Sequence, residues 1–196
     1  MRHNLSEIKA LIEDRRSIAP ELYSARTVHE EVLTELLDMA RWAPTHRYTQ
    51  PWFFRVFVGD GRARLGQMMA HIYRNTTPAQ AQSETKEAKL RERPMLAPAV
   101  IAIGLRRDPE KRDPLQEEIA SVAMAVQNMK LVAAAHGLGM YWTTGGVTYT
   151  DAMRTAMGLG TDDLFLGLLY VGYPKEEWPR PTRRRPVEYY TEWVRE

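Results

Sequence analysis

The chain has 196 residues, of which 44% are hydrophobic and 27% are charged, and its formal net charge is +2 at pH 7. These values are typical of one globular domain with a sizeable core, and they give no general attraction to nucleic acid or membranes. The absence of cysteine excludes disulfides, thiolate metal sites and a cysteine nucleophile. Because neither a signal peptide nor an apolar run of roughly 20 residues is recognisable, we expect a cytoplasmic protein without a membrane span.

The first predicted helix ends at a basic motif. Apolar side chains recur at three- and four-residue steps, at Leu5, Ile8, Leu11 and Ile12. The helix leads into Arg15-Arg16-Ser17. Two guanidinium groups at a helix exit form either a solvated helix end or a binding site for an anion such as phosphate.

A polar loop follows the second predicted helix. Thr27 and Glu30 have the spacing of a capping box, which predicts that Thr27 caps this helix. The loop runs from residue 43 to residue 52, and Pro44 and Pro51 fix its two ends. It carries hydroxyl, imidazole, guanidinium, phenol and amide groups. Such a loop is either a polar helix-to-strand turn or a binding site.

The remaining pattern predicts an α+β fold in one domain spanning residues 1–196. Continuous apolar runs predict strands over residues 52–58, 98–105 and 164–174, and amphipathic patterns predict helices between them. The longest helix, residues 115–136, is apolar nearly all round in its middle, which favours complete burial inside the fold and at a subunit interface. Residues 141–146 combine an aromatic pair, two threonines and two glycines.

Two polar segments flank this core. Residues 76–94 are rich in charged and amide side chains, and we expect an exposed, partly helical excursion that acts as a lid. Residues 179–196 form a basic C-terminal arm with Arg180, Arg183, Arg184 and Arg185. The arm is either solvated, a nucleic-acid contact, or a segment that closes over an anionic ligand.

Familiar catalytic motifs are absent from the sequence. The five histidines have no metal-binding spacing, no serine lies in G-x-S-x-G, and Gly137-Leu138-Gly139 lacks the third glycine of a dinucleotide fingerprint. We therefore expect no metal and no protein nucleophile. A cofactor that reacts while the protein positions it fits this pattern better.

Four motifs in order resemble the FMN-dependent nitroreductase family over nearly the whole chain. They are Arg15-Arg16-Ser17, the loop Ala43-Pro44-Thr45-His46-Arg47-Tyr48-Thr49-Gln50-Pro51-Trp52, the long helix leaving through Gly137-Leu138-Gly139, and the final strand with Gly172-Tyr173-Pro174 followed by arginines. The likeness is greatest to a small single-domain subgroup that carries His in the second motif. It implies a mainly antiparallel sheet flanked by helices, in an intertwined homodimer with FMN at the subunit interface.

The resemblance also implies which residues bind the flavin. The first motif and the arm would hold its phosphate, ribityl chain or ring edge, the second motif would approach from the partner subunit, and residues 142–145 would line the ring. The implied contacts are Arg15, Arg16, Ser17, Trp42, Thr45, His46, Gln50, Trp142, Thr143, Thr144, Gly145, Arg183 and Arg185. Tyr48 stands where many members have Asn, and Ala19-Pro20 stands where members often have another Arg or Lys. In the family the first position often contacts the flavin ring, and the second departure would shift phosphate neutralisation toward Arg16 and the C-terminal arginines.

The implied activity is hydride transfer from NADPH or NADH through FMN to a nitroaromatic, quinone or similar flat acceptor, by a ping-pong mechanism. No protein acid or base is required, because the flavin carries the hydride and solvent supplies protons. The alternatives are another flavin-dependent reaction, such as dehydrogenation, dehalogenation or flavin consumption, or non-catalytic flavin storage or sensing. The sequence names neither the physiological acceptor nor the preferred nicotinamide.

Overall fold

The structure is a computed structural model that describes residues 2–195. Its centre is one sheet with the strand order β1-β2-β4-β3, in which every neighbouring pair is antiparallel. The strands are β1 (Trp52–Val58), β2 (Ala99–Leu105), β3 (Gly139–Thr143) and β4 (Leu164–Gly172). The predicted α+β class with a mainly antiparallel sheet is confirmed, and the strand predicted over residues 52–58 has the bounds of β1.

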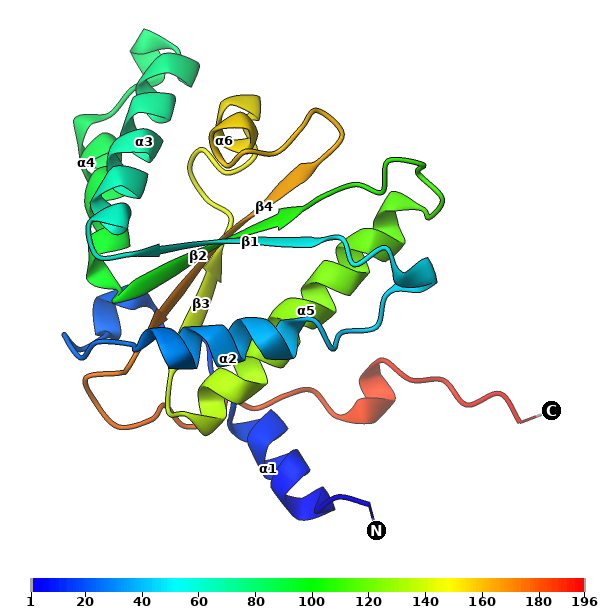
Figure 1. The fold of residues 1–196 in the computed structure, drawn as a ribbon. Helices are drawn as coiled ribbons and strands as arrows, with labels where there is room; N and C mark the ends of the chain where they lie inside the picture. The colour runs from blue at the N-terminus through cyan, green and yellow to red at the C-terminus, as the bar shows by residue number, and fades with distance from the viewer. Residues whose placement is uncertain (1, 196) are drawn as a thin grey trace.

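Helices cover both faces of the sheet (Figure 1). They are α1 (Leu5–Asp14), α2 (Glu30–Ala40), α3 (Asp60–Thr76), α4 (Glu84–Glu92), α5 (Leu115–Ala135) and α6 (Asp151–Ala156). Short 3-10 turns occupy Pro20–Leu22, His46–Tyr48, Ala79–Ala81, Arg93–Leu96 and Val187–Tyr189. One core cluster lies between the sheet and α2 with α5, and the other lies between the sheet and α3 with α6.

Strand β2 explains why the two cores form. All its residues are buried, and alternate side chains enter opposite clusters: Ile101 and Ile103 face α2 and α5, whereas Val100 and Ala102 face α3 and α6. A strand covered on both faces is apolar without alternation, which is the pattern that predicted it.

The start of α2 differs from the prediction. The helix begins at Glu30 with His29 as its N-cap residue, and no side chain accepts a capping hydrogen bond there. The capping box predicted from Thr27 and Glu30 is therefore wrong. Buried Val28 belongs to the core cluster under α2, so packing of this residue sets the entry of the chain into the helix.

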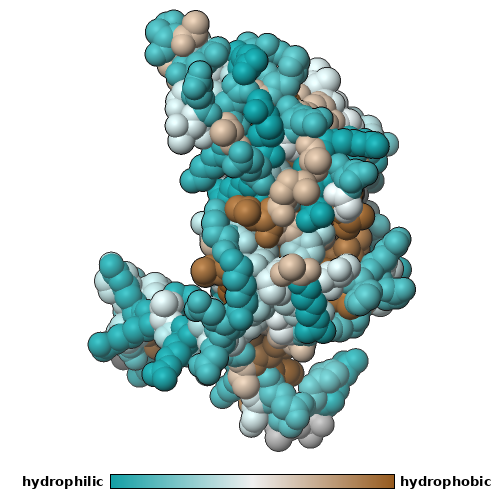
Figure 2. All heavy atoms as spheres, turned by 90° about the vertical axis from the view of Figure 1, so that its left-hand side faces the viewer, coloured by the Kyte–Doolittle hydropathy of each residue, from teal (hydrophilic) through white to brown (hydrophobic). Residues whose placement is uncertain are grey.

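Residues 76–94 contain an ordered helix, α4, that packs closely on α3. A Cβ atom on Gly66 of α3 would lie 2.0 Å from the Arg91 carbonyl oxygen, so glycine permits this approach. Glu87 forms ion pairs with Arg74 at 2.7 Å and with Arg91 at 2.5 Å. None of the α4 residues is fully buried, and Figure 2 shows a mostly hydrophilic surface over the upper part of this lobe. The lid role of the segment stays a prediction.

Three segments expose apolar side chains in the single chain. The C-terminal arm extends away from the body (Figure 1). Helix α1 has no buried residue, and α5 exposes a stripe of side chains. The stripe consists of Ala120, Ala123, Met124 and Gln127. Met124 is 39% exposed, whereas neighbouring Val122 and Ala125 are fully buried. Over residues 2–195, no helix has the length and apolar character needed to cross a membrane.

Candidate functional site

The loop between α2 and β1 has a strained backbone. Arg47, Tyr48 and Gln50 have φ values of 47°, 55° and 47°, in the left-handed region that side-chain-bearing residues rarely adopt. The backbone N–H of Gln50 donates to Thr45 Oγ1 at 3.1 Å, and the Thr45 and Thr49 hydroxyl oxygens lie 3.3 Å apart. Strain that is held by side-chain hydrogen bonds is a property of functional loops more than of connecting turns.

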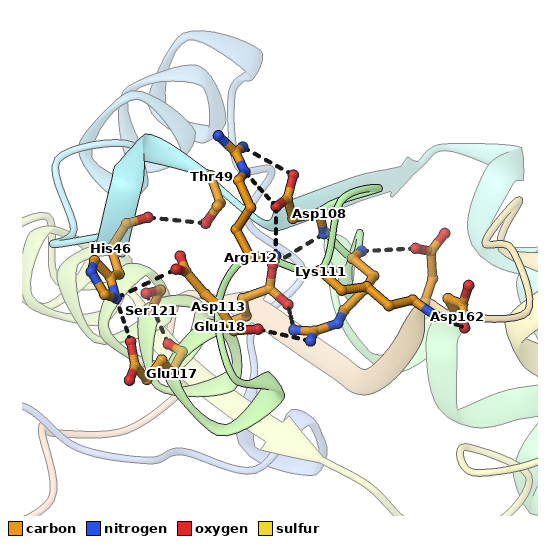
Figure 3. Close-up of polar contacts among 12 residues, drawn as sticks. His46, Thr49, Asp108, Lys111, Arg112, Asp113, Glu117, Glu118, Ser121 and Asp162 are labelled. Atoms are coloured by element: carbon orange, nitrogen blue, oxygen red, sulfur yellow. Dashed lines mark hydrogen bonds and ion pairs between the residues drawn. The ribbon is translucent and has the colours of Figure 1, made fainter.

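Acidic residues at the start of α5 fix this loop in place (Figure 3). His46 Nδ1 lies 2.7 Å from Glu117 Oε2 and 3.5 Å from Asp113 Oδ1, and Arg47 Nε lies 3.4 Å from the same Asp113 oxygen. The Asp113 side chain is 1% exposed. Neither Asp113 carboxylate oxygen has a hydrogen bond within the described residues, so the charge of the Arg47 guanidinium beside it offsets the cost of its burial. Sequence reasoning missed both acids.

A second ionic group stabilises the same end of α5. Arg107 pairs with the buried Glu118 carboxylate, which also accepts the Asp108 amide at 3.1 Å. Arg112 binds Asp108 through Nε at 2.8 Å and Nη2 at 3.0 Å. This guanidinium bond lowers the pKa of Asp108 to about 2. These ion pairs fix the connection between β2 and α5, and therefore the positions of Asp113 and Glu117, which lie beside His46.

The Arg15-Arg16-Ser17 segment lies beside strand β3. Ser17 forms a parallel bridge with Met140, and the buried Tyr23 hydroxyl donates to the Ile18 carbonyl at 2.7 Å. Arg16 Nε donates to the Pro179 carbonyl at 3.1 Å, which joins the segment to the C-terminal arm. Arg16 Nη2 is buried without a hydrogen-bond partner among the described residues. A buried, unpaired guanidinium N–H is a donor available to an anion.

Four cations gather around this segment. Burial lowers the pKa of Arg15, and the charges of Arg16 and Arg184 lower it further. Burial likewise lowers the pKa of Lys130, with a second contribution from the charge of Arg15. Within residues 2–195, none of these four side chains forms an ion pair with a carboxylate. Partly buried cations without a counter-charge attract anions, and the guanidinium and ammonium donors match the oxygens of a phosphate group.

Two members of this cluster were missed by sequence reasoning. Lys130 is the one cation in the apolar middle and end of α5, and that isolation is the signal that could have identified it. In the arm, Arg184 is the arginine whose charge acts on Arg15, whereas the expectation from the sequence was that Arg183 or Arg185 reaches the flavin phosphate. Arg185 stacks on Tyr189, 4.0 Å from its ring centroid, and Arg183 is exposed.

The end of β3 separates its side chains between the two faces of the sheet. Trp142 packs against the core on the α2 and α5 side, and its indole N–H donates to the Leu166 carbonyl at 2.9 Å. Thr143 lines a pocket on the other side, together with Gly145. Thr144 and Gly145 are exposed, and Thr148 Oγ1 donates to the Gly145 carbonyl at 2.9 Å. The exposed backbone of residues 144–145 is therefore held by its neighbours.

One chain does not bring all the expected flavin contacts together. The His46 group lies beside Glu117 and the cationic cluster lies beside Lys130, thirteen residues further along α5. At 1.5 Å per helical residue, the two groups are about 20 Å apart. Figure 1 shows the residue 46–48 turn and α1 near opposite ends of α5. Trp42, which follows the C-cap residue of α2, is 69% exposed and Tyr48 is 85% exposed, so both side chains face solvent in the single chain.

Comparison with known proteins identifies the family. The sequence model of the Nitroreductase family matches residues 12–173 of this chain. YfhC of Bacillus subtilis, whose name assigns it provisionally to the NAD(P)H nitroreductases, is 28% identical over 94% of this chain and 93% of its own. A nitroreductase-like family protein of Bacillus cereus has a TM-score of 0.81 at 27% identity, with 98% of both chains covered.

A provisional nitroreductase of Desulfovibrio desulfuricans, solved in complex with FMN, shares the fold. Its TM-score is 0.71 at 24% identity, with 98% of this chain and 99% of that chain covered. The family match spans most of the chain and includes the basic motif after α1 from Arg15 onward, the strained loop and all four strands. The chain belongs to the nitroreductase family.

Proposed function

We propose that the protein is an FMN-dependent oxidoreductase that uses NADPH or NADH to reduce a nitroaromatic, a quinone or a similar flat acceptor. Family membership, the nitroreductase name of the Bacillus relative and the FMN complex of the Desulfovibrio protein support the proposal. When bound, FMN would supply the redox chemistry by taking a hydride from the nicotinamide and then passing electrons to the acceptor, which uses the same face in a ping-pong sequence.

The single observation that carries the proposal is the cationic cluster. Arg15, Arg16 and Lys130 are partly buried, Arg184 of the exposed arm lies near Arg15, and none of the four has a carboxylate ion pair among the described residues. These residues would hold the FMN phosphate, and Arg183 and Arg185 would extend the same arm toward it. The clustering of like charges destabilises the empty site, so a bound phosphate gains more than it would at an exposed pair.

Residues 142–145 would bind the flavin ring. Trp142 is anchored in the sheet by its bond to Leu166, so it would position the strand end, while Thr143, Thr144 and Gly145 would present hydroxyl and backbone groups to the ring. Ser17 lies beside β3 and would contact the ribityl chain or ring edge. Fixed donors of this kind stabilise negative charge without reorganisation. No side chain is assigned as an acid or base, because solvent can supply the protons.

The remaining contacts would come from a second subunit of a homodimer. The exposed stripe of α5 is centred between Ala123 and Met124. A two-fold axis at that point, relating two antiparallel α5 helices, would bring the partner's Glu117 opposite Lys130, because the two residues are equally distant from the centre. The partner's loop would then complete the site. Its contributing residues would be Trp42, Thr45, His46 and Gln50.

The test is the visible absorption spectrum of the protein purified without added cofactor, repeated after anaerobic NADPH and NADH. Flavin bands that bleach with a nicotinamide and return with menadione or nitrofurazone support the proposal. A colourless protein that fails to take up FMN would overturn it, and bound flavin that never bleaches would indicate storage or sensing. Arg15→Gln should weaken FMN binding about tenfold through loss of a charged hydrogen bond, whereas Arg64→Gln, at an exposed position on α3, serves as the matched control.

A further inference from the structure

A pocket connects α4 to the proposed flavin-binding segment. Its volume is about 270 Å³, and it is bounded by α4 on one side and by Thr143 and Gly145 on the other. The two walls touch, because a Cβ atom on Gly146 would lie 2.8 Å from Leu90 Cδ2. The volume falls just below the roughly 300–1,000 Å³ of small-molecule pockets, which suits a single aromatic ring.

Apolar side chains form the floor of this pocket. Met69 of α3 and Leu168 and Tyr170 of β4 line it, and all three side chains belong to the core cluster on this face of the sheet. Their rigid packing gives the pocket an apolar surface against which an aromatic ring can lie.

The rim of the pocket is cationic. Lys86, Lys89 and Arg93 line it, and no carboxylate does so within the described residues. Arg93 Nε lies 3.2 Å from Glu21 Oε1, and its guanidinium lies over the Tyr170 ring, 5.5 Å from the centroid. Neither lysine has a carboxylate ion pair within residues 2–195, and Glu87 of the same helix pairs with Arg74 and Arg91. Lys86 Nζ lies over the Tyr73 ring, 5.1 Å from its centroid.

We infer that α4 selects acceptors that carry an anionic substituent, with Lys86 and Lys89 binding the carboxylate of an aromatic acid whose ring lies on the apolar floor. The inference rests on the proposed function, since it assigns the acceptor side of the same site. Two unpaired ammonium groups at the rim of an apolar pocket provide charge complementarity for such a compound and for no neutral analogue. They act as specificity determinants and take no part in the redox step.

The experiment compares 4-nitrobenzoate with 4-nitrobenzamide as acceptors for the FMN-loaded protein. Each reduction of the nitro group to a nitroso group consumes one NADPH and one proton and releases water, so NADPH absorbance follows both reactions. The two acceptors differ in intrinsic reactivity, so the readout is the change of their kcat/KM ratio between variants. Lys86→Gln and Lys89→Gln should each lower the ratio of benzoate to benzamide about fivefold, the scale of one partly exposed ion pair.

The matched control is Lys111→Gln, which removes the same charge at a site where Lys111 pairs with Asp162 at 2.9 Å, away from the pocket. It should leave the ratio unchanged. Raising the ionic strength should lower the wild-type ratio, because added salt screens the attraction. An unchanged ratio in both lysine variants would overturn the inference. A fall in activity with NADPH relative to NADH in the lysine variants, with an unchanged acceptor ratio, would also overturn it, because the lysines would then bind the 2′-phosphate of NADPH.

Calorimetric titration separates this inference from the proposed function. Each acceptor is titrated into the FMN-loaded protein without nicotinamide, so that no turnover is required. If neither compound is reduced and menadione and nitrofurazone are not reduced either, the proposed function fails, and the titration alone decides the inference. The inference is supported if the protein binds 4-nitrobenzoate at least fivefold more tightly than 4-nitrobenzamide and if Lys89→Gln loses this difference. Equal binding of both compounds contradicts the inference.

Discussion

Lys130 illustrates how a binding site appears in the energetics of a single residue. Its ammonium group is partly buried in the apolar end of α5, and both burial and the charge of Arg15 lower its pKa. A cation in such a place destabilises the free protein, and the proposed phosphate site would give it an anionic partner. The same reasoning applies to the unpaired Nη2 of Arg16.

Lys130→Met should therefore have opposite effects on stability and on binding. The thermal midpoint of the flavin-free protein should rise, because a desolvated charge is replaced by an apolar side chain of similar length. FMN affinity should fall about tenfold through loss of a charged partner for the phosphate. Differential scanning calorimetry and fluorescence titration with FMN measure the two effects. A variant that binds FMN as tightly as the wild type would remove Lys130 from the phosphate site.

Asp108 gives a pH dependence whose sign can be worked out. Its folded-state pKa is lowered to about 2, chiefly by the bond from Arg112, whereas an unperturbed aspartate titrates near roughly 3.9. A depressed pKa stabilises the folded protein at all pH values above the unfolded pKa, and the contribution is lost as the pH falls from about 4 to about 2.

Asp108→Asn should consequently be less stable than the wild type by a constant amount above about pH 5, with the difference shrinking below about pH 4. Urea unfolding at a series of pH values measures it. Asp162→Asn is the control, because Asp162 forms an exposed pair with Lys111 and should show a much smaller difference. A difference that persists unchanged at pH 2 would contradict the assignment.

At the scale of elements, the sequence pattern identifies helix α5 but does not show which of its residues stay exposed. Its position, Leu115–Ala135, agrees with the prediction of a helix over residues 115–136, because a long run of helix-forming residues ends at Gly137. The run is apolar nearly all round, but only part of it is buried in one chain, and the stripe of Ala120, Ala123, Met124 and Gln127 stays exposed. Periodicity identifies the helix, whereas only the packing of α2 and the sheet determines which stripe stays uncovered.

The proposed dimer can be tested at that stripe. The natural chain contains no cysteine, so Ala123→Cys introduces a single thiol next to the proposed axis. Antiparallel packing of the small-residue stripes should bring the two Cα atoms within about 7 Å, the range of a disulfide. Mild oxidation should then give a covalent dimer on non-reducing electrophoresis. Gln67→Cys, exposed on α3, should not cross-link, and failure of Ala123→Cys to do so in a dimer would reject this axis.

At the scale of the molecule, the terminal segments are separate from the core. Residues 179–195 contain no buried residue, and the hydrogen bond from Arg16 Nε to the Pro179 carbonyl joins them to the body of the protein. Ending the chain after Trp178 should therefore leave the sheet and its two cores folded. The truncated protein should show unchanged far-ultraviolet circular dichroism, with FMN affinity lowered at least tenfold because Arg184 is removed. Loss of the folded core on truncation would contradict this description.

The sequence by itself determined the long helices, three of the four strands and the family, but it did not predict β3 or the start of α2. Continuous apolar runs give buried strands, apolar residues at three- and four-residue steps give helices, and the order of four short motifs indicates a nitroreductase; each of these signals is local in the chain. Only the tertiary structure decided which charges meet. It pairs His46 with Glu117, gathers Lys130 and Arg184 around Arg15, and brings α4 to Thr143. These contacts join residues far apart in the chain, and their geometry follows from strand order and helix placement, which no local pattern encodes.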